Sequence, residues 1–570
     1  MPLPNHVQIR GSRPHWLLDL VIGGARYRIA DEALEVPTAA GGVLYYAPGV
    51  DPDLSVTLTG GPLSIAITLD GATPEGVPWA LILARGGGGA LTGATAELRR
   101  WWESQTFEQS RWIVGGSLTK PVVGTADEEF EFSIERIGDE NASTVPPAEA
   151  RIDETTSPIQ VAAATGLTAE PDPATRGKYM PWIFGTPGRD VIALTESWQI
   201  SAAATPGYII THYPHTWYQY GQWVIAGHPV QATQVRITDA SAGYGRHAIP
   251  SALFAVTTGI DLRGREVAIV TYGAAYVDVH LNKGNEYQVT WEESTGGGLY
   301  NADRTGPMRA AGEIVEYLLR FVGERVDSGR MAATRAYLDR FALDFAITEP
   351  IRPRAWIDDN LGKFLPIVWN ESEDGAFLDV LRYDPALPAV LALVEAEDAE
   401  DDPDDGVPVV RQGKPEASDP ASVANDITVK YAPIYGGELR KRLRIAAPGI
   451  AGTEGVADPS VSGEYPTWRA GISQTRHEAR LRTVELPCVC ADDTAQLAGA
   501  EFLLVNGVTR RKFSVTGQPD DLDVLDVCSR VLYSSARLYM TEAPANVRWI
   551  KLANDQDEVG LELLDDPGSP

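Results

Sequence analysis

The chain has 570 residues, of which 44% are hydrophobic and 22% are charged, with 55 glycines and 40 prolines. This length predicts about three to five domains, and the many turn-forming residues favour a globular protein dominated by β-structure. A formal net charge of −30, from 78 acidic and 48 basic residues, argues against tight binding of nucleic acid or anionic lipid by the whole surface. Such a surface suits solubility, a salty habitat or a wall past which nucleic acid slides.

Residues 1–140 are predicted to form an N-terminal β domain. The stretches "WLLDLVIGGARYRIAD" and "LSVTLTGGPLSIAITLD" each have the pattern of a hairpin, around the glycines at 23–24 and around residues 60–62. Between them and the end of the domain, "ATAELRRWWESQTFEQSRWIVGGSLTKPVV" predicts one short helix. The run "EEFEFSIERIG" predicts a half-buried strand with one apolar face: Phe130, Phe132, Ile134 and Ile137.

The next two segments differ in composition. Residues 141–180 are rich in Ala, Thr, Pro and Glu, which is typical of a linker. Residues 181–300 contain short alternating runs such as "QVRITDA", "REVAIVTYG" and "EYQVTWEES", and are predicted to form a second β domain.

Residues 301–385 predict an insertion made of a helical hairpin and strands. In "GEIVEYLLRFVGERVDSGRMAATRAYLDRF", residues 312–341, apolar side chains recur at i, i+3, i+4 and i+7. Either Asp327 or Ser328 can cap the second helix. The apolar faces of the two helices comprise Ile314, Tyr317, Leu318 and Phe321, and then Met331, Thr334, Leu338 and Phe341.

Residues 386–425 are predicted to be an acidic loop rich in Pro and Gly. Residues 426–570 predict a C-terminal α+β, barrel-like domain, which begins with the strand "NDITVKYAP" and continues with the helix "DDTAQLAGAEFLLVNG". Its further predicted strands are "RRKFSVTG", "LDVLDVCSRVLY", "VRWIKLA" and "EVGLELL".

The cysteines and the chain start indicate a cytoplasmic site of synthesis. Only Cys488, Cys490 and Cys528 are present, too few for a disulfide framework. The stretch "MPLPNHVQIRGSRPHWLLDLVIGG" lacks the apolar core of a signal peptide, and no run reaches about 18 uninterrupted apolar residues. We therefore expect a soluble protein without an export signal and without direct membrane binding.

No motif predicts a catalytic residue, a cofactor-binding residue or a cofactor. The glycine-rich pieces "ARGGGGALTG" and "IFGTPGRD" lack the Lys-Ser/Thr pair of a phosphate loop and are interpreted as turns. The sequence has no G-x-S-x-G elbow. Paired carboxylates of the glycosidase type cannot be located among 78 acidic residues, so sequence neither indicates nor excludes hydrolysis.

No motif predicts a metal site either. His212 and His215 in "HYPH" have no partners to complete a four-coordinate centre. Cys488 and Cys490, at i and i+2, are interpreted as small buried residues on one strand face. The acidic run 395–405 offers oxygen ligands but lacks the spacing of a calcium loop, and a solvated loop is the preferred interpretation.

The order of these features resembles the baseplate hub or tail-tip proteins of long-tailed, siphovirus-like bacteriophages and of gene transfer agents. The main block is residues 310–385, and "GKYMPWIFGTPG" resembles a second segment through Pro181, Ile183, Phe184 and Gly185. The chain departs from the family at Leu525-Asp526, where the family usually has Gly-Asp. The matches in the main block are Ile314, Tyr317, Leu318, Leu319, Val326, Asp327, Leu338, Asp339, Phe341, Trp356, Ile357, Leu365 and Pro366.

The resemblance implies a structural virion protein, not an enzyme, with β-barrel domains of tail-tube type. It implies a homotrimeric ring at the distal tail tip that contacts tail tube and tape-measure proteins, distal tail protein and fibre or spike proteins. Phage DNA would only pass through its lumen. On this hypothesis the helical hairpin packs against the barrels or a neighbouring chain, and an ordinary intrachain hairpin is the alternative. The candidate assembly residues are Ile314, Leu318, Phe321, Leu338, Phe341 and Trp356.

Two other functions are compatible with the sequence. The aromatic loop "HYPHTWYQYGQW" could stack on sugar rings in an enzyme that degrades cell walls or glycans. A receptor-binding module is the third hypothesis.

Overall fold

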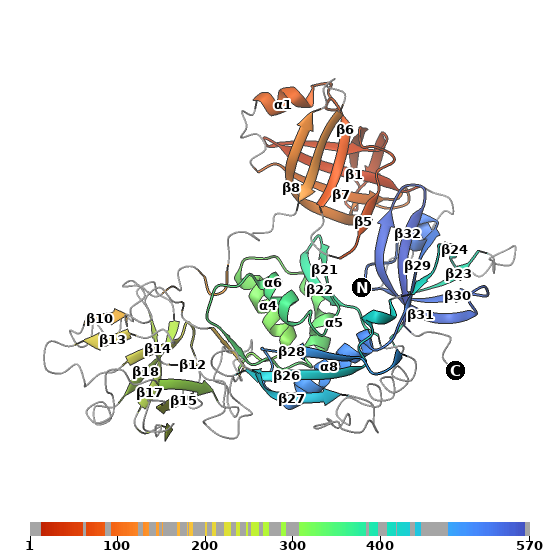
Figure 1. Ribbon diagram of the computed structural model, residues 1–570. Coiled ribbons are helices and arrows are strands. Elements are labelled where there is room, and N and C mark those ends of the chain that lie inside the picture. The colour runs from red at the N-terminus through yellow and green to blue at the C-terminus, as the bar shows by residue number, and fades with distance from the viewer. Residues whose placement is uncertain are drawn as a thin grey trace.

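The chain is mainly β, with six α-helices among the described residues, which confirms the predicted fold class. Figure 1 shows an N-terminal module, a central body, a C-terminal barrel and a group of small sheets. The structure is a computed structural model, and it describes residues 13–60, 64–85, 93–123, 129–135, 144–147, 151, 168–171, 179, 182–185, 200–201, 208–211, 222–229, 235–239, 247–248, 252, 254–260, 266–272, 287–291, 307–383, 387–396, 407–417, 419–433, 439–445 and 477–564.

The N-terminal module, residues 13–135, is an eight-stranded sheet in the order β3-β4-β2-β1-β7-β8-β9-β6, with helix α1 (Trp79–Arg85) beside it. The predicted hairpin at the Gly-Gly pair is present, and Gly23 and Gly24 both have positive φ, which suits glycine. In the core the rings of Trp79 and Phe130 stack at 5.3 Å. The strands are β1 (His15–Ile22), β2 (Ala25–Ala30), β3 (Leu34–Pro37), β4 (Val43–Pro48), β6 (Ser64–Asp70), β7 (Thr95–Trp101), β8 (Arg111–Val123) and β9 (Glu129–Glu135).

Two predictions in this module were wrong. The predicted short helix between residues 94 and 123 is instead β7, the single 3-10 turn Phe107–Gln109 and β8. Alternation in β7 was hidden because Arg100, a charged residue, occupies an inward position. The second predicted hairpin is absent, because β5 (Val56–Leu58) pairs with a strand near residue 550 and β6 pairs with β9.

The C-terminal barrel is closed by six strands in the order β24-β23-β30-β31-β32-β29, with the pairs Arg411↔Thr516 and Gln412↔Val515 joining the first to the last. Strand β23 is parallel to β30. The chain between these two strands includes the sheet and the helix of the central body within residues 426–506. The short helix α9 (Pro519–Leu522) follows β29. The strands are β23 (Leu391–Glu395), β24 (Val409–Gln412), β29 (Arg511–Gly517), β30 (Arg530–Ser535), β31 (Met540–Leu552) and β32 (Asp557–Leu563).

Two barrel strands therefore come from residues 386–425, which the sequence predicted to be a loop. Strand β23 has only five residues and β24 only four, and prolines and acidic residues surround both. Short runs in such surroundings carry little periodic signal. In the same way, "LDVLDVCSRVLY" supplies only β30 at its end, since residues 521–528 form helix and turn.

The central body contains the predicted helical hairpin, α4 (Ala311–Phe321) and α5 (Ser328–Leu338). The side chain of Asp327 accepts a hydrogen bond from the backbone N–H of Arg330 at 3.0 Å, which identifies Asp327 as the cap of α5. Other elements of this body are α6 (Pro353–Asn360), α8 (Asp492–Asn506), the pair β11 (Trp182–Phe184) and β20 (Phe345–Ile347), the hairpin β21 (Ile367–Ser372) and β22 (Gly375–Val380), and the sheet β27 (Leu439–Ile445), β26 (Asp426–Pro433) and β28 (Leu481–Glu485).

Between residues 168 and 291, the described strands other than β11 form small sheets, and the short strands predicted from residue 181 onward are among them. They lie at one end of the ribbon in Figure 1. The strands are β10 (Thr168–Pro171), β12 (Ile200–Ser201), β13 (Tyr208–Thr211), β14 (Gln222–Ala226), β15 (Val235–Asp239), β16 (His247–Ala248), β17 (Phe254–Ile260), β18 (Glu266–Tyr272) and β19 (Tyr287–Trp291).

Cys488 and Cys490 are buried, as predicted, although residue 488 lies in a turn before α8 and not on a strand. Burial raises the pKa of the Cys488 thiol to about 12, and it also raises the pKa of Cys528. We expect iodoacetamide at pH 8 to leave the folded chain almost unlabelled, because a pKa near 12 lowers the thiolate fraction more than about a thousandfold. Intact-mass measurement should find all three cysteines labelled in urea, and rapid labelling of Cys488 in the folded chain would contradict its burial.

Candidate assembly interfaces

The N-terminal module and the C-terminal barrel are joined by strand pairing. In β5, residues Val56–Leu58 pair antiparallel with residues 550–552 of β31. The buried apolar side chains of the module and the barrel also form one continuous cluster, which includes Trp16 and Ile67 from the first and Tyr533 and Val559 from the second. We call this contact the joint. It unites segments from opposite ends of the sequence, as Figure 1 shows.

A buried ion pair lies at the joint. The guanidinium of Arg100 donates to both carboxylate oxygens of Asp557, at 2.7 and 2.9 Å, and to the carbonyl oxygen of Ala553, and both charged side chains are 0% exposed. Burial raises the pKa of the Asp557 carboxyl, and the charge and hydrogen bonds of Arg100 oppose that rise. Fully desolvated pairs of this kind hold two surfaces in one register, because removal of either partner leaves an uncompensated buried charge.

A second arginine of the N-terminal module extends this contact. Arg111 donates to the carbonyl oxygens of Asp523 and Leu525 at 2.6 and 2.9 Å, and to the carboxylate of Asp526 at 2.8 Å. Asn554 donates to the carboxylate of Asp31 at 3.0 Å. These polar contacts fix the barrel against the module at several points.

The N-terminal module also contacts the hairpin β21–β22 of the central body. Arg99 forms an ion pair with Glu373, in the hairpin turn, at 2.9 Å. Gly60 has a positive φ of 76°, and a Cβ there would lie 2.1 Å from a methyl group of Val368, so only glycine fits this approach. The N-terminal module therefore contacts both the C-terminal barrel and the central body.

Sequence reasoning found none of the joint residues. Arg100 is a charged residue at an inward position of β7, so it hides the alternation of that strand, and the sequence gives no hint of its partner. Asp557 follows "KLANDQ", where an acidic residue is typical of an ordinary turn. Contacts between residues 457 positions apart leave no local pattern.

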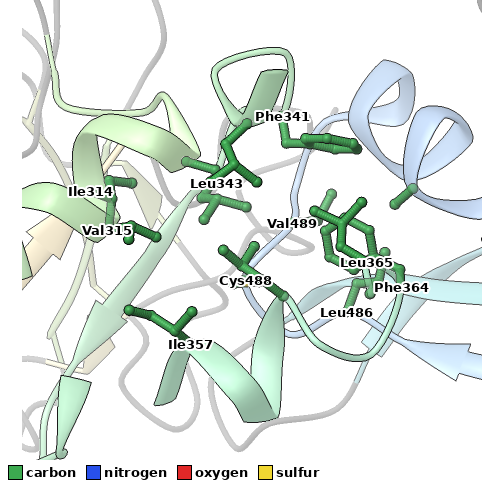
Figure 2. Close-up of a cluster of buried hydrophobic side chains, with 14 of the residues drawn as sticks. Ile314, Val315, Phe341, Leu343, Ile357, Phe364, Leu365, Leu486, Cys488 and Val489 are labelled. Atoms are coloured by element: carbon green, nitrogen blue, oxygen red, sulfur yellow. The ribbon is translucent and has the colours of Figure 1, made fainter. Parts of the chain in front are cut away.

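The predicted assembly candidates have different surroundings. Four of the six are 0% exposed within the chain's own core: Ile314, Leu318, Leu338 and Phe341. Figure 2 shows Ile314 and Phe341 in this core with side chains from the loop at residues 364–365 and from residues 486–489. The segments that carry the sequence resemblance, including Trp182–Phe184, Ile357, Leu365 and the helix from Asp492, therefore converge in one cluster.

The other two candidates reach the surface. Phe321 is 39% exposed, and its ring contacts that of Trp182 with centroids 4.6 Å apart. Trp356 is partly buried, and its ring stacks on Phe345 at 4.6 Å. If the hairpin contacts a neighbouring chain, these two side chains are the candidates that remain available to do so.

A buried histidine supports the segment Trp182–Phe184. The N–H of Ile183 donates to Nε2 of His228 at 2.9 Å, and Nδ1 of His228 lies 2.9 Å from the carbonyl oxygen of Pro229. Burial lowers the pKa of His228 to about 4, so the ring is neutral at pH 7. A neutral ring with Nδ1 protonated satisfies both contacts.

The remaining motifs of the sequence fall outside the described residues: His212, His215, the aromatic loop up to residue 221, and the acidic run beyond Ala396. Among the residues that the structure does describe, no three His, Cys, Asp or Glu side chains are grouped so that they could bind a metal ion. The described helices include none with the length and apolarity needed to cross a membrane.

Comparison with known proteins gives matches among solved structures alone. No family model matches the chain, and no curated protein matches it. It is similar to a tail protein from Neisseria meningitidis MC58, with 8% identity, 96% of each chain covered and a TM-score of 0.37. It is also similar to the 43 kDa tail protein of prophage MuSo2 from Shewanella oneidensis, with 9% identity, 96% of each chain covered and a TM-score of 0.34.

A third similar structure is the virion of a native gene transfer agent particle, with 10% identity, a TM-score of 0.38 and coverage of 69% of this chain and 86% of that chain. These structural neighbours are tail proteins and a virion, the class of protein that the sequence resemblance names.

Proposed function

We propose that this chain is the structural hub of a phage-type tail tip, a homotrimeric ring that closes the distal end of the tail tube. The observation that carries the proposal is the joint, where a β module from each end of the chain lies side by side and shares the pairing of β5 with β31. A chain built in this way presents two β modules at once.

The presence of two β modules in each chain matters for the symmetry of the proposed ring. A ring of three chains with two β modules each offers six modules, and six modules can meet a six-fold tube without a mismatch of symmetry. The buried Arg100–Asp557 pair and the contacts of Arg111 would keep the two modules at a fixed spacing around the ring. The central body, with the helical hairpin in its core, would then connect the ring to distal tail and fibre or spike proteins.

The charge of the chain suits a channel for DNA. A net charge of −30 repels the phosphate backbone, and a lumen wall of that sign would let DNA pass without adhering. The tube and tape-measure proteins would contact the ring on its proximal side. We infer a role in assembly and DNA exit, with no chemical step assigned to the chain.

Two measurements test this proposal. Analytical ultracentrifugation of the purified chain at micromolar concentration should give three times the 61.5 kDa chain mass, and a monomer at that concentration would contradict a self-assembling trimer. Antibody against the chain, applied to intact particles and viewed by negative-stain microscopy, should label the distal tail tip. Label along the tube or on the capsid would refute the hub location, whatever the mass in solution.

A further inference from the structure

A groove of about 620 Å³ lies in the central body, on the side of the sheet that ends with β28. Its volume is within the roughly 300–1,000 Å³ of typical binding pockets. Three segments line it: residues 362–366, residues 482–485 of β28, and Phe502, Val505 and Asn506 of α8.

The groove runs along the edge of β28. Four consecutive residues of this strand, 482–485, line it, and consecutive strand residues alternate between the two faces of a sheet. A groove that lay over one face of the sheet would be lined by only every second residue of β28, so the lining by four consecutive residues indicates the strand edge. In the part of the chain that the structure describes, β28 pairs only with β26, so its other edge carries N–H and C=O groups without a strand partner.

The walls combine apolar surface with positive charge. Phe364, Pro366 and Phe502 contribute apolar surface, and Lys363 and Arg482 contribute cations. Glu485 is already compensated, because Lys430 binds its carboxylate at 2.9 Å. Arg482 packs over the ring of Phe502 at 5.8 Å, and the charge of Lys363 joins that of Lys430 in lowering the pKa of Glu485. In a chain with a net charge of −30, this leaves a locally cationic groove.

We propose that β28 and its groove bind an extended, acidic segment of a partner protein by strand addition. The main chain of that segment pairs with the free edge of β28, alternate apolar side chains enter the space beside Phe364 and Phe502, and carboxylates lie opposite Lys363 and Arg482. Main-chain pairing provides affinity in this mode, and pockets for alternate side chains provide specificity. Four strand residues span about 13 Å, enough for a short linear segment.

The test uses the full chain and a fluorescein-labelled peptide of five Val-Glu repeats, titrated at low salt by fluorescence anisotropy. We expect saturable binding that weakens about tenfold or more in the variant K363E/R482E, since each contact becomes a repulsion. The matched control is K120E/K512E, which changes the net charge equally at exposed positions on the N-terminal module and the barrel and should bind as the wild type does. Near-UV circular dichroism checks that both variants fold.

Two further peptides separate strand addition from charge alone. A Val-Glu peptide that is N-methylated at every residue has no N–H left on either edge and cannot complete a strand ladder, and five Val-Lys repeats carry the wrong charge, so neither should bind. Equal binding of the N-methylated peptide, equal binding to K363E/R482E, or no binding of the Val-Glu peptide at 1 mM would overturn the proposal. Self-association of the chain that K363E/R482E abolishes would also overturn it, because the occupant would then be a second copy.

Discussion

Replacement of Arg100 by methionine is expected to lower the free energy of unfolding of the β modules by about 3–5 kcal/mol, because Asp557 is left buried without its partner. Urea titration followed by tryptophan fluorescence measures this loss. Arg325→Met is the matched control, since Arg325 and Asp374 form an exposed ion pair at 3.4 Å, and it should leave the transition almost unchanged. An equal effect of the two substitutions would mean that the buried pair does not stabilise the joint.

The same variant makes a prediction about pH. Burial raises the pKa of Asp557, and loss of Arg100 raises it further. An acid whose pKa is higher in the folded than in the unfolded state destabilises the fold above that pKa, and the cost disappears as the pH falls through it. The deficit of R100M relative to wild type should therefore shrink from pH 8 towards pH 5. The double variant R100M/D557N, which removes both charges, should recover most of the loss at neutral pH.

Phe341→Ala is expected to cost about 3–5 kcal/mol of stability in the central body, because the side chain is 0% exposed and its ring contacts Phe364 at 5.3 Å. Phe321→Ala, at a position 39% exposed, should cost less than half as much by the same urea titration. Similar costs for the two would contradict the burial that the structure assigns to them.

Mass photometry of F341A and of the double variant F321A/W356A tests the hairpin as an assembly element. If the hairpin contacts a neighbouring chain, F321A combined with W356A shifts the particle from trimer to monomer, whereas F341A changes stability without changing the mass of the folded fraction. Point substitutions are the sharper tool here, because deletion of residues 307–345 would remove the core formed by α4, α5 and β20.

The elements with a strong local period were predictable. The helix pair and the strand Glu129–Glu135 follow from spacing that a single segment carries within itself, whereas the sequence left the cap of the second helix open between Asp327 and Ser328. The pairing partner of a strand was not predictable, as β5 illustrates. Its three residues and the following glycines have the pattern of half a hairpin, yet the strand that pairs with β5 lies almost 500 positions later. Pairing is decided by which edge is free in the folded state, and local sequence does not encode that.

The assembly candidates show the same limit. Spacing identified Ile314, Leu318, Leu338 and Phe341 as apolar faces, but whether such a face meets its own chain or another one depends on distant segments. Their partners here include residues 364–365 and 486–489, which no heptad or alternation links to the hairpin. The groove beside β28 was equally hidden, because an edge is a property of the sheet and not of the strand.

The joint also imposes a delay during biosynthesis, because its two sides are synthesised at different times. Arg100 emerges from the ribosome 457 residues before Asp557, so at about 5–20 residues per second the N-terminal module waits roughly 20–90 s for the strand and carboxylate that complete it. Throughout that interval β5 has no β31 to pair with. A chain truncated before residue 540 would lack the shared pairing altogether, and the two modules could not take their fixed spacing. In the proposed ring, incorporation would be restricted to chains whose synthesis has passed this point.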